Sequence, residues 1–124
     1  QYNDVTLDVI AELQQRIDAA INAGIKAENI LIDPGFGFAK NAEQNLKLLQ
    51  QLHQLNGLGY PILSALSRKR FIGEAVGESD VQKRVVGSVA AHLISVQQGA
   101  SMVRVHDVKA TCDALKVWQA MQVV

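Results

Sequence analysis

The chain has 124 residues, of which 48% are hydrophobic and 19% are charged. This length suffices for one domain with a buried core but not for two, and the composition is typical of a globular protein rather than a disordered chain. Twelve basic and twelve acidic side chains give a net charge of zero. The charge balance therefore gives no reason to expect nucleic acid or an anionic membrane surface as a partner.

The single cysteine, Cys112, excludes an internal disulfide and fits a reducing compartment. No apolar run approaches the roughly 18 residues that a membrane span requires. No signal peptide is visible at the start of the chain. Because residue 1 is Gln rather than Met, we expect the chain to begin within a longer protein.

Apolar residues recur at helical spacing over residues 5–23, which predicts a first helix that stops at Gly24. The apolar run at residues 30–32 predicts a fully buried strand of the kind found in parallel sheets. Asn41 and Gln44 have the spacing of a capping box, which predicts that a second helix begins there.

Pro61 opens a second predicted strand at residues 62–66. A long helix is predicted over residues 81–98, a third strand over 102–105, and a last helix from about residue 109 to 121. Small residues on the long helix would let another element pack closely against it: Gly87, Ser88, Ala90 and Ala91. The predicted order is α-β-α-β-α-β-α.

The spacing of the strands indicates repeated βα units. Asp33 and Ser67 are 34 positions apart, and Ser67 and Arg104 are 37 apart. An open doubly wound sheet and part of a (β/α)8 barrel both fit this α/β pattern. Lys40 stands where the Rossmann fingerprint would have its third glycine, which weakens a dinucleotide site. A barrel needs about 250 residues, so this chain would be an incomplete one.

The segment after the first predicted strand has the composition of a ligand-binding loop. Asp33 provides a carboxylate at a strand end, and Gly35 and Gly37 permit a left-handed backbone and close approach of other groups. Phe36 and Phe38 are large apolar side chains where a plain connector would be polar. The plainer alternative is a strand-to-helix turn in which Asp33 is a capping residue.

Charged and polar side chains follow all three predicted strands. Asp33 ends the first, Ser67 and Lys69 follow the second, and Arg104 and His106 end the third. Active sites form at the carboxyl ends of parallel strands in both candidate architectures, so we expect these groups at one rim. A carboxylate can accept from a flat amidine-like edge, a guanidinium can stack on a ring or hold phosphate, and an imidazole can contact an anion. The set suits a nitrogen-rich heterocycle with an anionic leaving group.

Each part of this set also has a plainer explanation. The segment 67–70 by itself is typical of a solvated basic turn. Arg104 and Asp107 are spaced to form a structural ion pair, and His106 with Asp107 would serve to orient a loop. Neither zinc-type ligand spacing nor a nucleophile elbow is present. The functional interpretation therefore depends on the joint placement of these residues.

Three motifs resemble the C-terminal half of dihydropteroate synthase: Asp-Pro-Gly-Phe-Gly-Phe at residues 33–38, Ser-Arg-Lys at 67–69 and Arg-Val-His-Asp at 104–107. Their order and spacing match the family, and the resemblance covers essentially the whole chain. Ala39 departs from it, since many family members have Gly before Lys40. It lies beyond the tightest part of the loop, so we expect little consequence.

The resemblance implies that residues 1–124 are the C-terminal half of a single pterin-binding TIM-barrel domain. This family of folate-biosynthesis transferases joins 4-aminobenzoate to 6-hydroxymethyl-7,8-dihydropterin pyrophosphate and releases 7,8-dihydropteroate and pyrophosphate. Its members are cytoplasmic, are commonly homodimers through their last two helices, and are the target of sulfonamides, which compete with 4-aminobenzoate. Magnesium (Mg²⁺) assists departure of pyrophosphate, but its protein ligand lies in the N-terminal half, so no metal ligand is expected in this chain.

The resemblance also implies roles on the pterin side of the site. Asp33 would hold the N–H edge of the pterin, and Lys69 would donate to its ring acceptors. Arg104 would stack on the pterin ring and, together with His106, contact phosphate. Lys69, Arg104 and His106 are the expected catalytic residues.

Four further residues would bind substrate on the 4-aminobenzoate side. Phe38, Ser67 and Arg68 would shape the pocket for 4-aminobenzoate, and Phe38 and Ser67 are expected positions of sulfonamide contact. Gly37 would keep the loop low enough for both substrates.

Two other functions remain open from the sequence. Methyltetrahydrofolate-handling methyltransferases share the pterin floor but not the pyrophosphate chemistry, and the motifs at 67–69 and 104–106 favour the synthase. A non-catalytic half-barrel that acts by association is the third possibility. Three strands with an open edge would expose unpaired backbone groups and apolar helix faces, which a partner or the other half of the barrel would cover.

Overall fold

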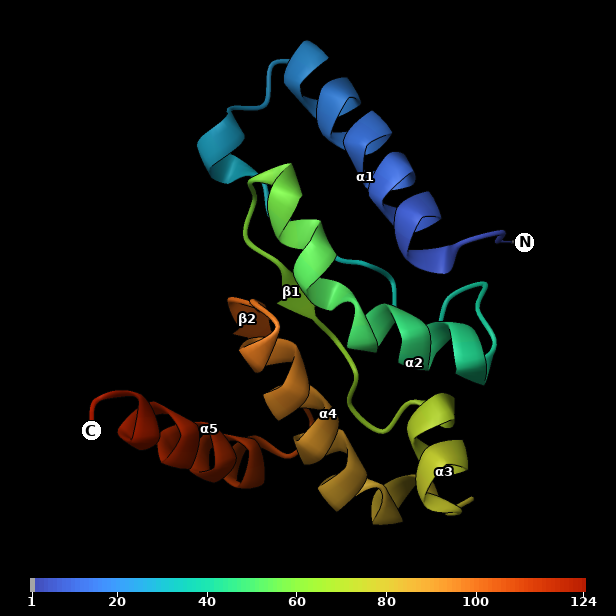
Figure 1. The fold of residues 1–124 in the computed structure, drawn as a ribbon, viewed down its shortest axis with the longest axis vertical. Helices are drawn as coiled ribbons and strands as arrows, with labels where there is room; N and C mark the ends of the chain where they lie inside the picture. The colour runs from blue at the N-terminus through green and yellow to red at the C-terminus, as the bar shows by residue number, and fades with distance from the viewer. Residues whose placement is uncertain (1) are drawn as a thin grey trace.

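The computed structural model describes residues 2–124 (Figure 1). Its elements alternate between helices and short strands, with three 3-10 helices (η) among them. In chain order they are α1 (Val5–Asn22), η1 (Ala27–Asn29), α2 (Ala42–Gln50), η2 (Leu52–Leu58), β1 (Leu63–Ser64), α3 (Arg70–Val76), η3 (Val81–Lys83), α4 (Val85–Gln97), β2 (Met102–Val103) and α5 (Val108–Gln122).

Three extended segments run parallel, as the repeated βα units predict. β1 pairs with β2, with Leu63 opposite Met102 and Ser64 opposite Val103. The first predicted strand is reduced to a single parallel bridge between Ile32 and Ile62. The bridge consists of hydrogen bonds from the Ile32 N–H to the carbonyl of Pro61, 2.9 Å, and from the Leu63 N–H to the carbonyl of Ile32, 2.8 Å.

The strands are shorter than their apolar runs predict, and the first is not fully buried. Leu31 is exposed, whereas Ile32 beside it is buried. Side chains alternate between the two faces of a strand, and Ile32 bridges only to Ile62 among the residues that the structure describes. After β1 and after β2 the chain leaves the sheet and forms the loops that carry Ser67 and His106.

The predicted helix boundaries are confirmed where a cap defines them. The Asp4 side chain accepts from the Leu7 N–H at 3.1 Å and caps α1. Asn41 and Gln44 form the predicted capping box at α2, with hydrogen bonds of 2.8 and 2.9 Å. The long helix predicted over residues 81–98 is wrong at its start, because Arg84 leaves helical geometry and separates η3 from α4.

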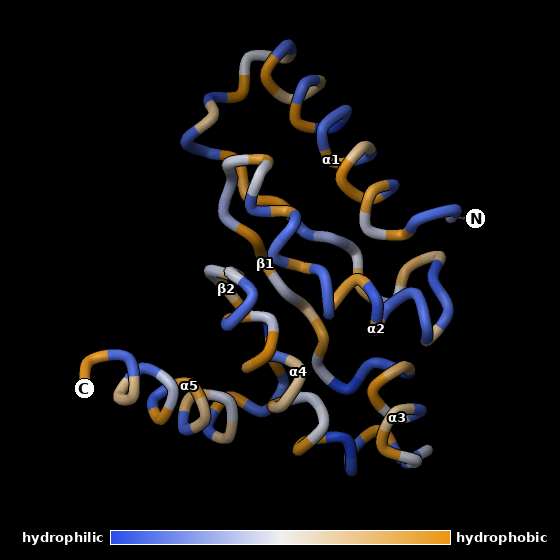
Figure 2. The backbone as a smooth tube through the Cα atoms, in the orientation of Figure 1, coloured by the Kyte–Doolittle hydropathy of each residue, from blue (hydrophilic) through white to orange (hydrophobic). Residues whose placement is uncertain are grey.

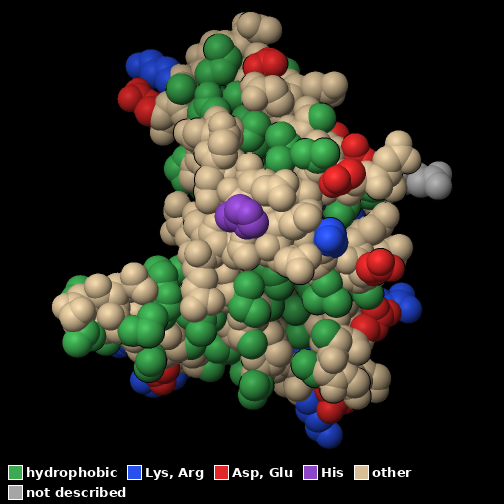
Figure 3. Space-filling model, viewed as in Figure 1, with side chains coloured by type: hydrophobic (Ala, Val, Ile, Leu, Met, Phe, Trp, Pro, Cys, Tyr) green, Lys and Arg blue, Asp and Glu red, His purple; other side chains and the backbone are tan. Residues whose placement is uncertain are grey.

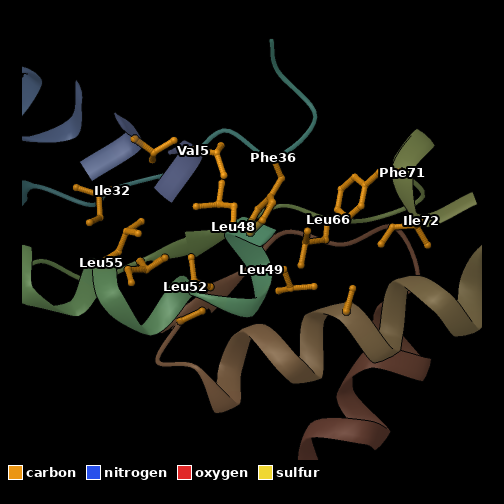
Figure 4. Close-up of a cluster of buried hydrophobic side chains, with 14 of the residues drawn as sticks. Val5, Ile32, Phe36, Leu48, Leu49, Leu52, Leu55, Leu66, Phe71 and Ile72 are labelled. Atoms are coloured by element: carbon orange, nitrogen blue, oxygen red, sulfur yellow. The ribbon is translucent and has the colours of Figure 1, made fainter. Parts of the chain in front are cut away.

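The core lies between the strands and the inner faces of α1, α2, η2, α3 and α4 (Figure 4). Its fully buried members include Phe36, Leu48, Leu52, Leu55, Ile62 and Leu66. The Phe36 ring stacks on Phe71 with 6.2 Å between the centroids. Phe36 is therefore a core residue rather than part of an open ligand floor, whereas Phe38 is exposed.

The outer helices keep much of their apolar surface uncovered. Hydrophobic and hydrophilic residues alternate along α1 and α5 in Figure 2. α5 packs against α4, yet Val108, Val117 and Met121 on α5 are exposed. Figure 3 shows hydrophobic side chains on the surface over this part of the molecule. Within residues 2–124, no helix is both long and apolar enough to cross a bilayer.

Candidate functional site

The loops that follow the three parallel strands are bonded to one another. The Lys69 ammonium donates to the carbonyl oxygen of Phe36, which connects the first and second loops. His106 contacts the Ser67 hydroxyl oxygen with its backbone N–H at 3.0 Å and its ring Nδ1 at 2.7 Å, which connects the second and third. The joint placement predicted from the strand ends is therefore confirmed for these residues.

Asp33 does not cap a helix. Its Oδ1 accepts from the Gly35 N–H at 2.8 Å, a local turn, and α2 is capped by Asn41 instead. The Asp33 side chain is exposed at the end of its strand segment. Because Oδ2 makes no hydrogen bond within residues 2–124, the carboxylate retains acceptor capacity toward the rim.

Two residues that the motif analysis did not single out hold the first loop in shape. The Lys40 ammonium donates to the carbonyls of Gly35 and Phe38 at 2.8 and 2.9 Å, and burial lowers its pKa. Asn45, buried on α2, accepts from the Gly37 N–H at 2.8 Å. The capping box predicts that Asn45 lies on the first turn of α2. That its side chain points into the protein, toward Gly37, depends on the tertiary structure.

Two features favour glycine at Gly37. Its φ of +85° lies in the left-handed region, and a Cβ there would approach the Lys69 Cδ to 3.1 Å. Ala39 is also left-handed, with φ of +53°. Ala39 lies after the turn that the hydrogen bond from the Phe38 N–H to the Gly35 carbonyl closes at 3.1 Å, but its backbone conformation is one that glycine adopts more readily.

Lys69 contacts the first loop and is influenced by the charges of Asp33, Arg104 and Lys40. Its ammonium is 5.0 Å from the centre of the Phe38 ring and bonds to the carbonyl of Phe36. Burial lowers the pKa of Lys69, the Asp33 carboxylate raises it, and the Arg104 and Lys40 charges lower it. A partly desolvated cation thus faces a carboxylate across the rim.

Arg68 and Asp107 form the ion pair that the sequence assigned to Arg104. The Arg68 Nη2 and Nε lie 2.8 and 3.2 Å from the two oxygens of Asp107. These hydrogen bonds raise the pKa of Arg68 and lower that of Asp107. The predicted Arg104–Asp107 pair is wrong, because Asp107 instead forms a bidentate salt bridge with Arg68. Arg104 is exposed.

A cleft of about 780 Å³ lies between the first loop and α3. Of the predicted site residues, Gly37, Phe38 and Lys69 line it. Arg68 does not, since its guanidinium is directed to Asp107. A smaller cleft of about 220 Å³ lies on the α1 side of the same loop and includes Asp33.

Similarity to known proteins agrees with this geometry. The sequence model of the pterin binding enzymes matches residues 1–106. The chain belongs to this pterin binding enzyme family. A dihydropteroate synthase from Haemophilus influenzae is 52% identical over 119 residues, which make up 96% of this chain and 43% of that protein.

Two solved structures of the Xanthomonas albilineans dihydropteroate synthase superpose on the full length of the present chain. Both have a TM-score of 0.99 and a sequence identity of 54%. One is a complex with 7,8-dihydropteroate, and the present chain covers 47% of its protein chain. The other is a complex with 4-aminobenzoic acid, and the present chain covers 45% of its protein chain. The chain thus spans about half the length of these relatives. Its α/β fold is that of part of a TIM-barrel enzyme, which confirms the barrel prediction.

The residues described here offer no fitting site for the magnesium that the family resemblance implies. No group of three or more His, Cys, Asp and Glu side chains within residues 2–124 is arranged to hold a metal ion. The Asp33 carboxylate is exposed, and its charge acts on the nearby Lys69 and Lys40 ammonium groups.

Proposed function

We propose that this chain carries the C-terminal part of a dihydropteroate synthase active site, as half of a single barrel domain. The observation that carries the proposal is the joining of three motif loops at one rim, through Lys69 with Phe36 and Ser67 with His106. The bound 7,8-dihydropteroate and 4-aminobenzoic acid of the Xanthomonas albilineans enzyme support the same substrates here. The reaction joins 4-aminobenzoate to the dihydropterin and releases pyrophosphate.

Asp33 and Lys69 would hold the two edges of the pterin. With Oδ1 fixed by the Gly35 N–H, Oδ2 of Asp33 would accept from the N–H edge of the ring. Lys69 uses one of its three N–H groups on Phe36 and keeps two for ring acceptors. Burial strengthens these hydrogen bonds, because the ammonium is partly removed from water.

Arg104 and His106 would stabilise the departing pyrophosphate. The Arg104 N–H donates to the Ser64 carbonyl at 3.0 Å, which fixes the backbone while the exposed guanidinium stays available. The Ser67 hydroxyl can accept from the His106 N–H and donate to Nδ1, which leaves Nε2 protonated as a donor to an anion. Positioned donors of this kind stabilise charge that develops as the leaving group departs.

The cleft beside Phe38 would accept 4-aminobenzoate. Phe38 and the buried rings of Phe36 and Phe71 lie along it, and Lys69, which also lines it, would reach the pterin from there. Ser67 would contribute through its hydroxyl, and Arg68 would contribute by holding Asp107 and the third loop rather than by direct contact. Sulfonamides, as competitors of 4-aminobenzoate, would occupy the same place near Phe38 and Ser67.

A complete active site would need groups beyond these residues. The other half of the barrel would complete the pterin floor and hold the magnesium. A homodimer through α4 and α5 would cover exposed apolar residues such as Val117 and Met121. Folate biosynthesis and a single exposed thiol, Cys112, both fit a cytoplasmic enzyme.

The test uses a completed enzyme, in which the segment of the Haemophilus influenzae relative that this chain does not match is fused ahead of residue 1. Both substrates and magnesium are supplied, and 7,8-dihydropteroate is measured by mass spectrometry. We expect product from the completed enzyme and its loss in Asp33→Asn.

The Haemophilus influenzae enzyme is the positive control. An active control with a silent but folded fusion would reject the proposed reaction. Binding of methyltetrahydrofolate without 4-aminobenzoate would point instead to the methyltransferase-type barrels. A fusion that binds neither ligand would favour a half-barrel that acts by association.

A further inference from the structure

Three polar side chains on one side of α4 contact the backbone of the loop that carries Ser67 and Lys69. Arg84, at the start of the helix, and Ser88 and His92, each four positions further, lie one above another because residues four apart share a helix face. In Figure 1 this helix runs beside the segment that connects β1 to α3. The contacts reach residues 16 to 26 positions earlier in the chain.

His92 is fully buried and holds the start of the loop. Its Nε2 accepts from the Leu66 N–H at 3.1 Å. Only a neutral imidazole can accept there, and burial lowers the pKa of His92 to about 4. His92 therefore remains an acceptor for Leu66 at neutral pH.

Ser88 holds the central residue of the turn. Its buried hydroxyl accepts from the Arg68 N–H at 2.8 Å and donates to the Arg84 carbonyl at 2.6 Å. Arg68 has φ of +58°, a left-handed conformation that a residue with a side chain adopts only when its surroundings hold it there. Ser88 supplies part of that restraint.

Arg84 holds the other side of the same residue. Its Nη1 donates to the carbonyl of Arg68 at 3.0 Å, while Nε and Nη2 donate to the carbonyls of Glu78 and Ser79 at 3.2 and 3.1 Å. The guanidinium packs on Gly73, where a Cβ would lie 2.3 Å from Nε. The N–H and the carbonyl of Arg68 are thus both bonded to α4 side chains.

We propose that Arg84, Ser88 and His92 are positioning residues of this site. Arg84 and Ser88 hold Arg68 in its left-handed turn, His92 holds Leu66 at the start of the loop, and together they set the directions of Ser67 and Lys69. The inference rests on the proposed function, since Ser67 and Lys69 are its substrate residues. The three side chains contact backbone rather than substrate. They act by reducing the conformations that the loop can adopt before substrate binds.

The first test compares Ser88→Ala with Ser95→Ala in the completed enzyme. Ser95 is equally buried on α4, but its hydroxyl donates to the His92 carbonyl of its own helix. We expect Ser88→Ala to lower kcat/KM by about tenfold, since the buried acceptor of the Arg68 N–H is lost, and Ser95→Ala to stay within about twofold. Equal kinetics in the two variants would overturn the inference.

The second test uses His92→Gln and His92→Leu. The Gln carboxamide oxygen can accept from the Leu66 N–H, whereas Leu fills the space without accepting. We expect kcat/KM to be retained in the Gln variant and lowered about tenfold in the Leu variant. Equal losses in both would show that His92 acts only through packing.

Hydrogen exchange at the Arg68 amide separates this inference from the proposed reaction. Faster exchange in Ser88→Ala than in Ser95→Ala would support the hold on the turn even if the completed enzyme made no product. In that case the proposed function would be rejected, and so would the effect of Arg84, Ser88 and His92 on catalysis. Identical exchange rates in the two variants would show that Ser88 does not restrain the backbone of Arg68.

Discussion

The Lys69 ammonium donates a hydrogen bond to the backbone carbonyl of Phe36, from the loop after β1 to the loop after the first strand segment. The Phe36 side chain is buried in the core and stacks on Phe71. Because a core residue anchors the acceptor, the position of the Lys69 charge at the rim is tied to the packing of the interior. This tie explains why a long, flexible side chain can serve as a fixed donor.

Removing that donor should weaken pterin binding. Lys69→Met keeps the length of the apolar stem but cannot donate, so we expect affinity for the pterin pyrophosphate to fall by about 1.5–3 kcal/mol, the usual value of hydrogen bonds to a charged group. Calorimetry on the completed enzyme measures this directly. Lys47→Met, an exposed change on α2, is the matched control, and equal affinities in the two variants would contradict the role of Lys69.

Asp33→Asn tests the carboxylate while leaving the local turn intact. The Asn Oδ1 can still accept from the Gly35 N–H, so the loop should keep its shape. We expect pterin affinity to fall by about 2–3 kcal/mol, because the charge-assisted acceptor is lost. Titration of the variant with the pterin substrate measures it, and unchanged affinity would remove Asp33 from the site.

Ser67→Ala should act mainly on 4-aminobenzoate and secondarily through His106. The change removes the oxygen that contacts both the N–H and Nδ1 of His106. We expect a higher KM for 4-aminobenzoate, with a smaller effect on the pterin.

A double-mutant cycle with His106→Ala measures the Ser67–His106 coupling. We expect non-additive losses in kcat, because the two residues share one contact. Strict additivity would mean that Ser67 does not orient the imidazole.

Ala39→Gly should leave the fold unchanged or stabilise it slightly. A left-handed residue with a Cβ costs about 1–2 kcal/mol, and Gly removes this cost at φ of +53° while adding about 0.4–1 kcal/mol of unfolded-state entropy. The net gain in the free energy of unfolding should be about 0–1.5 kcal/mol. In Ala19→Gly, inside α1, the same replacement should instead cost about 1 kcal/mol. Urea unfolding of the completed enzyme compares them.

His92 should make stability depend on pH in the acidic range. Its pKa of about 4 in the folded protein lies below its ordinary value of 6.5. Between these values the unfolded chain binds a proton that the folded chain does not, so the free energy of unfolding falls as pH falls from 6.5 toward 4. In His92→Gln this contribution should vanish. Unfolding curves at a series of pH values measure the slope, and parallel slopes in the two proteins would contradict the prediction.

Local sequence determined the features that depend on neighbouring residues. The capping box of Asn41 and Gln44 forms because its partners are three positions apart and meet at any helix start. The left-handed turns at Gly35 and Gly37 follow from the freedom of glycine. The regular spacing of apolar runs indicated parallel strands, which bring the motif loops to one rim whatever the details of packing.

Only the tertiary structure decided which partner each polar group found. Asp107 pairs with Arg68, 39 positions away, rather than with nearby Arg104, and the roles of Ser88 and His92 depend on contacts 20 and 26 positions away. Such choices depend on distances and directions that exist only once α4 has packed beside the loop. Sequence spacing therefore indicated which groups meet at the site. Packing decided which of these groups hold the loops in place and which remain free to bind substrate.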